Sequence, residues 1–166
     1  FHLLKYALEI CDQKSVEGLI KRLEALATHI SAKVRLVIFD TLSKAMPGRD
    51  ENAAKDMSLA IRNMEAIQRA TGGCIWAIHH PGKDQDRGMR GNSNVPAGAD
   101  FILRVKGKKG GLCELWIEKL KDGEDNKHIA TYRLETRQLG TTTKKGRDIT
   151  SAVIAWVEGE RAKRHV

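Results

Sequence analysis

The sequence predicts an α/β fold in which a mostly parallel sheet is extended on its C-terminal side by antiparallel hairpins. Two short apolar segments, 34–39 and 74–78, flank a segment whose apolar residues recur at helical spacing. This order is typical of a strand, a crossover helix and a second strand parallel to the first. After residue 100, short strand-like segments alternate with glycine-containing turns, which indicates hairpins.

Length and composition limit the class of protein. The chain has 166 residues, 41% of them hydrophobic, and a net charge of +8. We expect one domain over residues 1–158 and a basic tail at 159–166. No apolar segment approaches the roughly 20 residues of a membrane span, and the three cysteines form no CxxC pair, so we expect a cytoplasmic protein with reduced thiols and no membrane partner. The positive charge suits a polyanion such as nucleic acid.

The N-terminal part of the chain predicts one clear helix. Residues 3–11 are apolar and fit either a strand or a helix, and we favour a strand. From Ser15 to Ile30, apolar residues recur every three or four positions, which is typical of an amphipathic helix. We expect Ser15 to be its N-cap, because a serine side chain accepts hydrogen bonds from the free N–H groups of the first turn.

The segment from Val34 to Phe39 is a strand candidate that ends at Asp40. A run this short and apolar, with β-branched members, predicts a strand that is buried on both faces. Ligands of open α/β sheets bind at the carboxyl ends of strands, and a Walker B strand carries its Mg²⁺-binding aspartate there. The alternative is a buried strand that ends at a turn-forming aspartate without a ligand.

A second helix is expected between the two strands. Asp50 or Asn52 can cap its start, and the glycine pair Gly72-Gly73 follows its end near Ala70. Glycine is favoured just after a helix because it adopts the left-handed conformation without steric cost. We therefore expect the second strand to begin immediately after this pair.

The second strand, 74–79, is followed by a cluster of polar side chains. Because parallel strands end at the same edge of a sheet, His79, His80 and Lys83 should face Asp40. Carboxylate, imidazole and ammonium groups that converge there predict a phosphate or metal site. Two alternatives stay open: edge histidines without a role, and a metal-dependent hydrolase with Asp40, His79 and His80 as ligands.

The remaining chain predicts a loop followed by strands. Residues 81–95 are polar and contain glycines, and loops of this length in compact domains are usually functional or disordered. A basic turn is expected at 106–111. The expected strands are 101–105, 112–119, 128–135 and 149–157.

Five segments follow one another in the order LVIFDTLSK, GRDENAAKDM, CIWAIHHPGKD, GMRGNSNVPAGADFILRV and EKLKDGED. In this order they resemble the RecA-like ATPase domain of the RepA-type replicative helicases of plasmids and phages, hexameric, ring-forming members of the DnaB-like group. The resemblance covers residues 34–136 and implies a RecA-like P-loop NTPase core. It also implies ATP and Mg²⁺ as cofactors, hydrolysis at subunit interfaces, and single-stranded DNA as a partner.

The resemblance assigns roles to residues of the nucleotide site. Asp40 matches the Walker B aspartate that holds Mg²⁺, and Thr41 follows it beside the nucleotide. His80 matches the sensor of the γ-phosphate, with His79 as the near alternative. Lys83 is placed to offset phosphate charge.

Two lysines match a pair that reaches the nucleotide of a neighbouring subunit. These are Lys119 and Lys121, and the second of them stands where an arginine finger is expected. Arg90 and Arg104 are competing candidates for the finger. The alternative for the lysine pair is a solvated face of a hairpin.

A third group of residues is implied to contact DNA. The segment Arg90-Gly91-x-Ser93 matches a loop that faces the channel of the ring in these helicases, and Arg87 lies just before it. Basic loops that follow the phosphates of a strand bind DNA independently of its sequence.

One motif of such ATPases does not occur in the sequence. No G-x-x-x-x-G-K-[ST] segment is present, although this loop supplies the backbone cradle for the phosphates. We therefore expect these residues to be a C-terminal piece of the ATPase that does not hydrolyse ATP by itself. Two further functions stay open: a nucleic-acid-binding or regulatory module without ATPase activity, and a RecA-like ATPase that does not unwind DNA.

Overall fold

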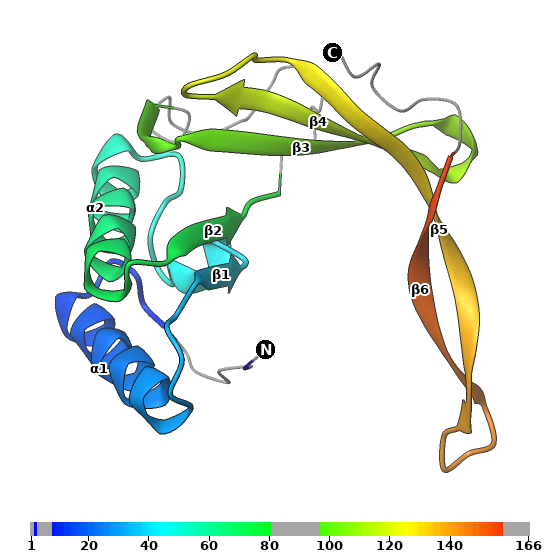
Figure 1. Cartoon of the computed structure of the whole chain (residues 1–166), viewed down its shortest axis with the longest axis horizontal. Coiled ribbons are helices and arrows are strands. Elements are labelled where there is room, and N and C mark those ends of the chain that lie inside the picture. The colour runs from blue at the N-terminus through cyan, green and yellow to red at the C-terminus, as the bar shows by residue number, and fades with distance from the viewer. Residues whose placement is uncertain (1, 3–7, 81–96, 158–166) are drawn as a thin grey trace. The chain divides into compact units, whose positions relative to one another are not determined.

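The computed structural model describes residues 2, 8–80 and 97–157. The chain divides into two compact units, residues 1–98 and 99–166, here called unit 1 and unit 2 (Figure 1). The domain bounds expected from the sequence stay a prediction.

The described part of unit 1 forms a strand–helix–strand unit preceded by a helix. In chain order the elements are α1 (Gln13–His29), β1 (Leu36–Asp40), the 3₁₀ helix η1 (Ser43–Ala45), α2 (Ala54–Thr71) and β2 (Cys74–Ile78). β1 and β2 are parallel, and their register runs from Leu36 opposite Cys74 to Asp40 opposite Ile78. The predicted pair of parallel strands joined by a crossover helix is therefore confirmed.

The helix starts differ from the prediction. α1 is capped by Asp12, whose Oδ2 accepts a hydrogen bond from the Ser15 N–H at 2.7 Å. Ser15 lies in the first turn, and its hydroxyl accepts a hydrogen bond from the Glu9 N–H at 3.1 Å. The prediction of Ser15 as the cap was therefore wrong, because an aspartate three residues earlier takes that place.

The predicted caps of α2 instead form a turn before the helix. The Oδ1 atom of Asp50 accepts hydrogen bonds from the backbone N–H of Asn52 at 2.9 Å and from its side-chain amide at 3.0 Å. These bonds, the backbone one first, hold the pKa of Asp50 below its ordinary value. The residue at the N-cap is Ala53, without a side-chain cap. The other end was predicted correctly, with Gly72 left-handed after Thr71.

The segment before α1 is also different. Residues 3–7 lie outside the described residues, and residues 8–11 form no strand. Ile10 is fully buried and its N–H donates to the Ala45 carbonyl at 2.7 Å. The buried side-chain amide of Asn63 donates to the Ile10 carbonyl at 2.7 Å. The backbone of Ile10 is thus held by η1 and α2 rather than by a neighbouring strand, so the expectation of a strand is wrong for this part.

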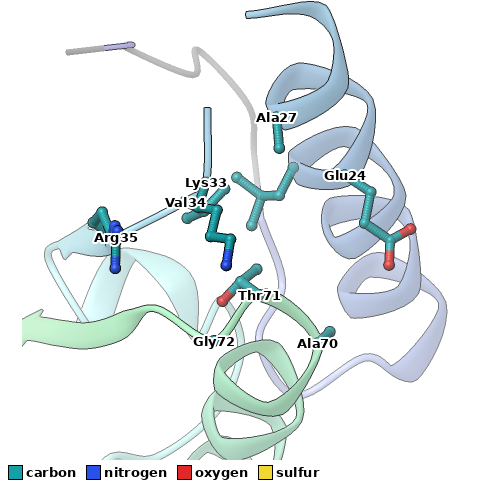
Figure 2. A pocket seen from close by; sticks show the side chains of 9 residues that line it. Glu24, Ala27, Lys33, Val34, Arg35, Ala70, Thr71 and Gly72 are labelled. Carbon is teal, nitrogen blue, oxygen red and sulfur yellow. The ribbon is translucent and has the colours of Figure 1, made fainter. Parts of the chain in front are cut away.

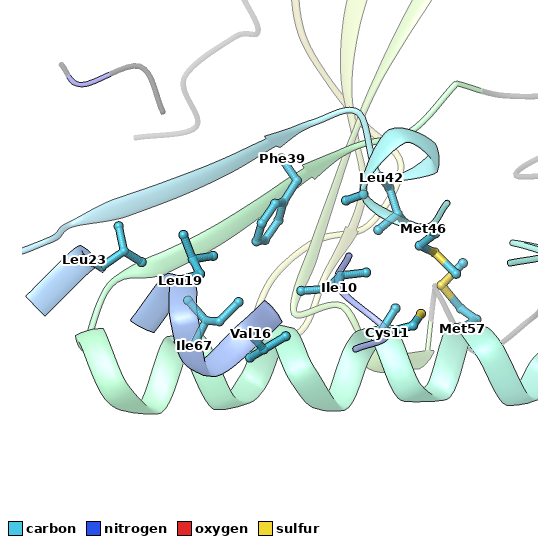
Figure 3. Close-up of a cluster of buried hydrophobic side chains, with 12 residues drawn as sticks. Ile10, Cys11, Val16, Leu19, Leu23, Phe39, Leu42, Met46, Met57 and Ile67 are labelled. Carbon is cyan, nitrogen blue, oxygen red and sulfur yellow. The ribbon is translucent and has the colours of Figure 1, made fainter. Parts of the chain in front are cut away.

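The core of unit 1 lies between the two helices and one face of the β1–β2 sheet (Figure 3). Figure 3 shows Leu19, Phe39 and Ile67 pointing into the same space from α1, β1 and α2. Apolar side chains at helical spacing on both helices create this face. The fully buried residues with large side chains are Ile10, Val16, Leu42, Met57 and Ile67.

The opposite face of the sheet is exposed. Leu36 and Ile38 of β1 are 43% and 45% exposed, and Trp76 and Ile78 of β2 are 40% and 41% exposed. The expectation that the first strand is buried on both faces is therefore wrong in this structure. The apolar run has two apolar faces, but the described helices cover one of them.

Gly73 occupies a position where any side chain would clash. A Cβ atom there would lie 2.9 Å from the Val34 carbonyl oxygen and 3.1 Å from the Arg35 carbonyl carbon. We expect Gly73→Ala to lower the free energy of unfolding by about 1–3 kcal/mol, because backbone at the start of β1 must shift. Urea denaturation measures this. Gly107→Ala is the control, since a Cβ there meets no atom within 4 Å, and an equal loss in both variants would contradict the steric explanation.

The described part of unit 2 is an antiparallel sheet. Its elements are β3 (Phe101–Gly107), η3 (Lys109–Gly111), β4 (Leu112–Leu120), β5 (Lys127–Thr142) and β6 (Asp148–Trp156). The strands pair in the order β3-β4-β5-β6. The expected hairpins are therefore confirmed, although β5 is much longer than predicted.

The predicted mixed α/β fold is confirmed in outline. The described strands form a parallel pair and an antiparallel set of four, and the continuation of one into the other as a single RecA-like sheet stays a prediction. Short turns allow each strand of unit 2 to pair with the strand before it, whereas a parallel pair needs a crossover connection. Among the described residues, no helix is both long and apolar enough to cross a membrane.

Candidate functional site

Asp40 and the two histidines lie at the same edge of the parallel sheet. Asp40 is the last residue of β1 and pairs in register with Ile78, the last residue of β2. The chain after β1 stays beside β2, because the Leu42 N–H donates to the Ile78 carbonyl at 2.8 Å. His79 and His80 follow directly. The predicted placement of the acid and the imidazoles at one strand edge is therefore met by the backbone.

The Asp40 carboxylate is available to a ligand. Its side chain is exposed, and it makes no hydrogen bond or ion pair with any described residue. A bare carboxylate at the carboxyl end of a parallel strand is a suitable oxygen ligand for Mg²⁺, which usually takes one or two carboxylates and completes its shell with water and phosphate oxygens. The donor available here therefore fits the ion that the sequence implies.

The two histidines have different surroundings. The His79 side chain is 13% exposed, and its Nδ1 lies 3.6 Å from Oε2 of Glu51. His80 is exposed. Of the two candidates for the phosphate sensor, His80 is the one that solvent and a ligand reach freely, and His79 faces a carboxylate of its own unit.

Glu51 is a residue of this edge to which the sequence assigned no role. It lies in the loop before α2, and its Oε2 atom is buried without a hydrogen-bond partner in the described structure. Such an atom is costly unless another group compensates its charge, and the His79 ring is the group within reach. The available signal was the polar triplet Asp50-Glu51-Asn52, but a loop residue gives no periodicity to follow.

The loop that carries Glu51 contacts the first turn of α2 and the segment just before α1. Arg49 lies 3.8 Å from a carboxylate oxygen of Asp56 in α2 and 3.9 Å from one of Glu9 before α1. The other Asp56 oxygen accepts a hydrogen bond from the Asp50 N–H at 3.2 Å. These partly exposed contacts are individually weak, but together they restrict where Glu51 can lie.

Thr41 is buried, with 7% of its surface exposed. Its hydroxyl accepts a hydrogen bond from the Lys44 N–H at 3.4 Å, and its carbonyl accepts one from the Ala45 N–H at 3.2 Å. These contacts give Thr41 a structural role at the start of η1. Its assignment to the nucleotide stays a prediction.

The lysine pair is held locally within unit 2. Nζ of Lys119 donates to the Ala99 carbonyl at 2.7 Å. Nζ of Lys121 lies 3.2 Å from a carboxylate oxygen of Asp100, and both side chains are largely exposed. The competing candidate Arg104 faces Glu118 at 3.4 Å. Lys121 therefore lies on a solvated face, whereas Lys119 and the Arg104–Glu118 pair are partly buried. The finger role stays a prediction.

Other predicted site residues cannot be placed. Lys83, Arg87, Arg90, Gly91 and Ser93 all lie outside the described residues. Their roles toward phosphate and DNA stay predictions.

The three-ligand metal site of the hydrolase alternative does not form. Asp40, His79 and His80 are all described, and no group of three His, Cys, Asp or Glu side chains in the described part of the chain converges in a way that could hold a metal ion. The described structure therefore gives no support to the hydrolase alternative.

A hollow of about 360 Å³ lies elsewhere in unit 1, at the amino end of β1 (Figure 2). It is open between the C-terminal parts of α1 and α2, and Figure 2 shows Glu24, Lys33 and Thr71 at its rim. Asp40 lies at the other end of β1, so this hollow is separate from the edge where the predicted residues meet.

Comparison with known proteins decides the family. A family model described as an AAA domain matches residues 2–86, a little more than half of the chain. The chain belongs to the AAA domain family. The match supports a nucleotide-binding, ATPase-like function. No protein of curated function matches the chain.

The extent of the match agrees with the division of the chain. Residues 2–86 lie within unit 1, so the AAA domain assignment includes Asp40, Glu51, His79 and His80. The antiparallel sheet of unit 2 lies beyond the matched residues. Assignments for unit 2 must therefore rest on its own residues.

Proposed function

We propose that this AAA domain is part of an ATP-dependent DNA helicase of the RepA type that acts in plasmid or phage replication. The observation that carries the proposal is the unpaired, exposed carboxylate of Asp40 at the same sheet edge as the exposed His80. In α/β sheets this edge is where phosphates and their metal ions are bound. The order of sequence segments through residues 34–136 supports the helicase in particular.

In this proposal Asp40 holds Mg²⁺ and β1 fixes its position. When bound, the ion neutralises phosphate charge and orients the β- and γ-phosphates. His80 donates a hydrogen bond to the γ-phosphate and detects whether it is present. The neighbouring His79 stays against Glu51, which anchors the start of the segment that follows β2.

Basic residues complete the nucleotide site. Lys83 offsets phosphate charge, and Lys119 or Lys121 reaches the nucleotide of a neighbouring subunit, where a cation stabilises the charge that develops during phosphoryl transfer. The exposed ion pair between Lys121 and Asp100 is weak enough to exchange for a phosphate, because such pairs contribute about 0–1 kcal/mol.

The partners in the proposal are single-stranded DNA and further copies of the chain, arranged as a hexameric ring in the cytoplasm without a membrane contact. Arg87, Arg90, Gly91 and Ser93 contact the DNA strand in the channel of the ring. Because these 166 residues contain no G-x-x-x-x-G-K-[ST] segment, the proposal requires that residues outside this sequence supply the phosphate-binding loop.

Two assays on the intact protein test the proposal. We expect Mg²⁺-dependent ATP hydrolysis that single-stranded DNA stimulates, and ATP-dependent displacement of one strand from a forked duplex. Hydrolysis without displacement would instead support a non-unwinding ATPase. DNA binding without hydrolysis would instead support a binding or regulatory module.

A further inference from the structure

The hairpin formed by β5 and β6 extends beyond the rest of its sheet. The last residue pair between β4 and β5 is Leu112 with Arg133. β5 continues to pair with β6, as far as Gln138 opposite Thr150 and, after an irregularity, at Thr142 opposite Asp148. The part of β5 from Leu134 to Thr142 therefore belongs to a two-stranded ribbon, roughly 30 Å long at about 3.4 Å per residue. Figure 1 shows this ribbon leaving β3 and β4.

The end of the ribbon is an ordered turn, here called the hairpin tip (residues 143–147). The Thr143 N–H donates to the Arg147 carbonyl at 2.8 Å, and the Gly146 N–H donates to the Thr143 carbonyl at 2.9 Å. The Thr143 hydroxyl accepts from the Arg147 N–H at 3.2 Å. Gly146 has a φ of 73°, which glycine adopts without strain. The tip thus presents its side chains from a defined backbone.

Three cations at the tip have no counter-charge. Lys144, Lys145 and Arg147 are exposed, and their side chains make no ion pair or hydrogen bond with any described residue. The nearest acid along the chain, Asp148, instead accepts a hydrogen bond from the Gln138 amide at 3.1 Å. The tip therefore concentrates positive charge that nothing in the described structure neutralises.

Several other described cations of unit 2 are paired. Each of four basic side chains lies 3.2–3.4 Å from a carboxylate oxygen, in the pairs Arg104–Glu118, Lys108–Glu114, Lys121–Asp100 and Lys127–Glu124. The unpaired cluster is thus a local feature of the tip rather than a general property of the sheet. Clustered, unneutralised cations raise the local affinity for polyanions.

The remaining side chains of the tip favour phosphates as the target. Thr143 of the tip and the adjacent Thr141 and Thr142 at the end of β5, all exposed, add hydroxyl groups, which together with lysine and arginine are usual partners of phosphate oxygens. The tip has no aromatic side chain on which an unpaired base could stack, and stacking is the usual mode for single strands. A two-stranded ribbon also fits the major groove of duplex DNA, about 12 Å wide.

We propose that the hairpin tip binds the sugar-phosphate backbone of duplex DNA, in a contact separate from the nucleotide site. Lys144, Lys145 and Arg147 contact phosphates, and the threonine hydroxyls add hydrogen bonds that hold the ribbon in register with the groove. Because these contacts go to phosphates, which are the same at every base pair, binding is independent of sequence. This contact with DNA requires neither ATP nor the helicase activity proposed above.

Fluorescence anisotropy with a labelled duplex, in the absence of nucleotide and over a range of NaCl concentrations, tests the tip in the intact protein. For the triple variant Lys144→Ala, Lys145→Ala, Arg147→Ala we expect an affinity lower by about 10-fold or more. We also expect a salt dependence whose slope, log Kd against log salt, falls by about 2–3, since each lost phosphate contact contributes about 0.9. Circular dichroism melts check that the fold is retained.

The control variant removes the same charge from paired positions outside the ribbon: Arg69→Ala, Lys108→Ala, Lys127→Ala. We expect it to change duplex affinity by less than about twofold, since these cations face carboxylates. Equal losses in both variants would show that net charge alone matters and would overturn the proposal. Unchanged duplex binding by the tip variant would overturn it too.

The test separates this inference from the proposed helicase. Loss of duplex binding in the tip variant, with ATP hydrolysis in the absence of DNA unchanged, supports the tip as a DNA contact. Tip-dependent duplex binding in a protein that does not hydrolyse ATP would reject the proposed helicase and retain the tip contact.

Discussion

Replacing Asp40 with asparagine is expected to lower Mg²⁺-dependent ATP hydrolysis by the intact protein about 100-fold or more. The substitution keeps the size of the side chain but removes the charge that holds the cation. A bound metal ion contributes several kcal/mol of charge stabilisation in phosphoryl transfer, and a loss of about 3 kcal/mol corresponds to roughly two orders of magnitude in rate. Steady-state phosphate release at saturating ATP and Mg²⁺ measures the effect.

The structure indicates that this variant should fold normally. The Asp40 side chain is exposed and bonds to no described residue, so its replacement breaks no contact within the described structure. Glu65→Gln is a matched control, because Glu65 is an exposed acid of the same unit whose partner is Arg69 one turn away at 3.7 Å. An Asp40→Asn protein that keeps more than half of its hydrolysis rate would remove the basis of the proposed nucleotide site.

The position of Asp40 was predictable because its signals are local and strong. A short apolar run that ends in an acid, a helical segment and a second apolar run together specify parallel strands, and parallel strands bring their carboxyl ends to one edge. The same reasoning placed His79 and His80 beside that edge. The difference in surroundings between His79, which lies beside Glu51, and the exposed His80 was not predictable. It depends on the position of Glu51, which lies in a loop without a periodic pattern.

Other predictions were wrong for reasons that a single sequence does not reveal. Asp12 and Ser15 are both good helix caps, and only the fold decides that the aspartate takes the cap and the serine binds the Glu9 backbone. An apolar run predicts a strand with two apolar faces, but the run alone does not determine whether helices cover both of them. The excess of positive charge in the last third of the chain was visible, but its concentration at the hairpin tip depends on where β5 turns.

The stability of unit 1 is expected to depend strongly on Ile67. This residue of α2 is fully buried and lies in the cluster formed by α1, α2 and β1, where Figure 3 shows it facing Leu19 and Val16. Truncation of a buried isoleucine to alanine removes apolar contact and leaves a cavity, and such changes cost about 2–5 kcal/mol. We expect Ile67→Ala to lower the free energy of unfolding by about 3 kcal/mol.

Urea denaturation followed by circular dichroism, with hydrogen exchange of the α1 and α2 amides, measures this loss. Gln68→Ala is the control, because Gln68 is the next residue of the same helix and is exposed, so its replacement should change stability by less than about 0.5 kcal/mol. Faster exchange in both helices of Ile67→Ala would show that they share one core with β1. A loss no larger than that of the control would mean that α2 does not pack on the sheet as described, and the edge that carries Asp40 and Glu51 would then lose its support.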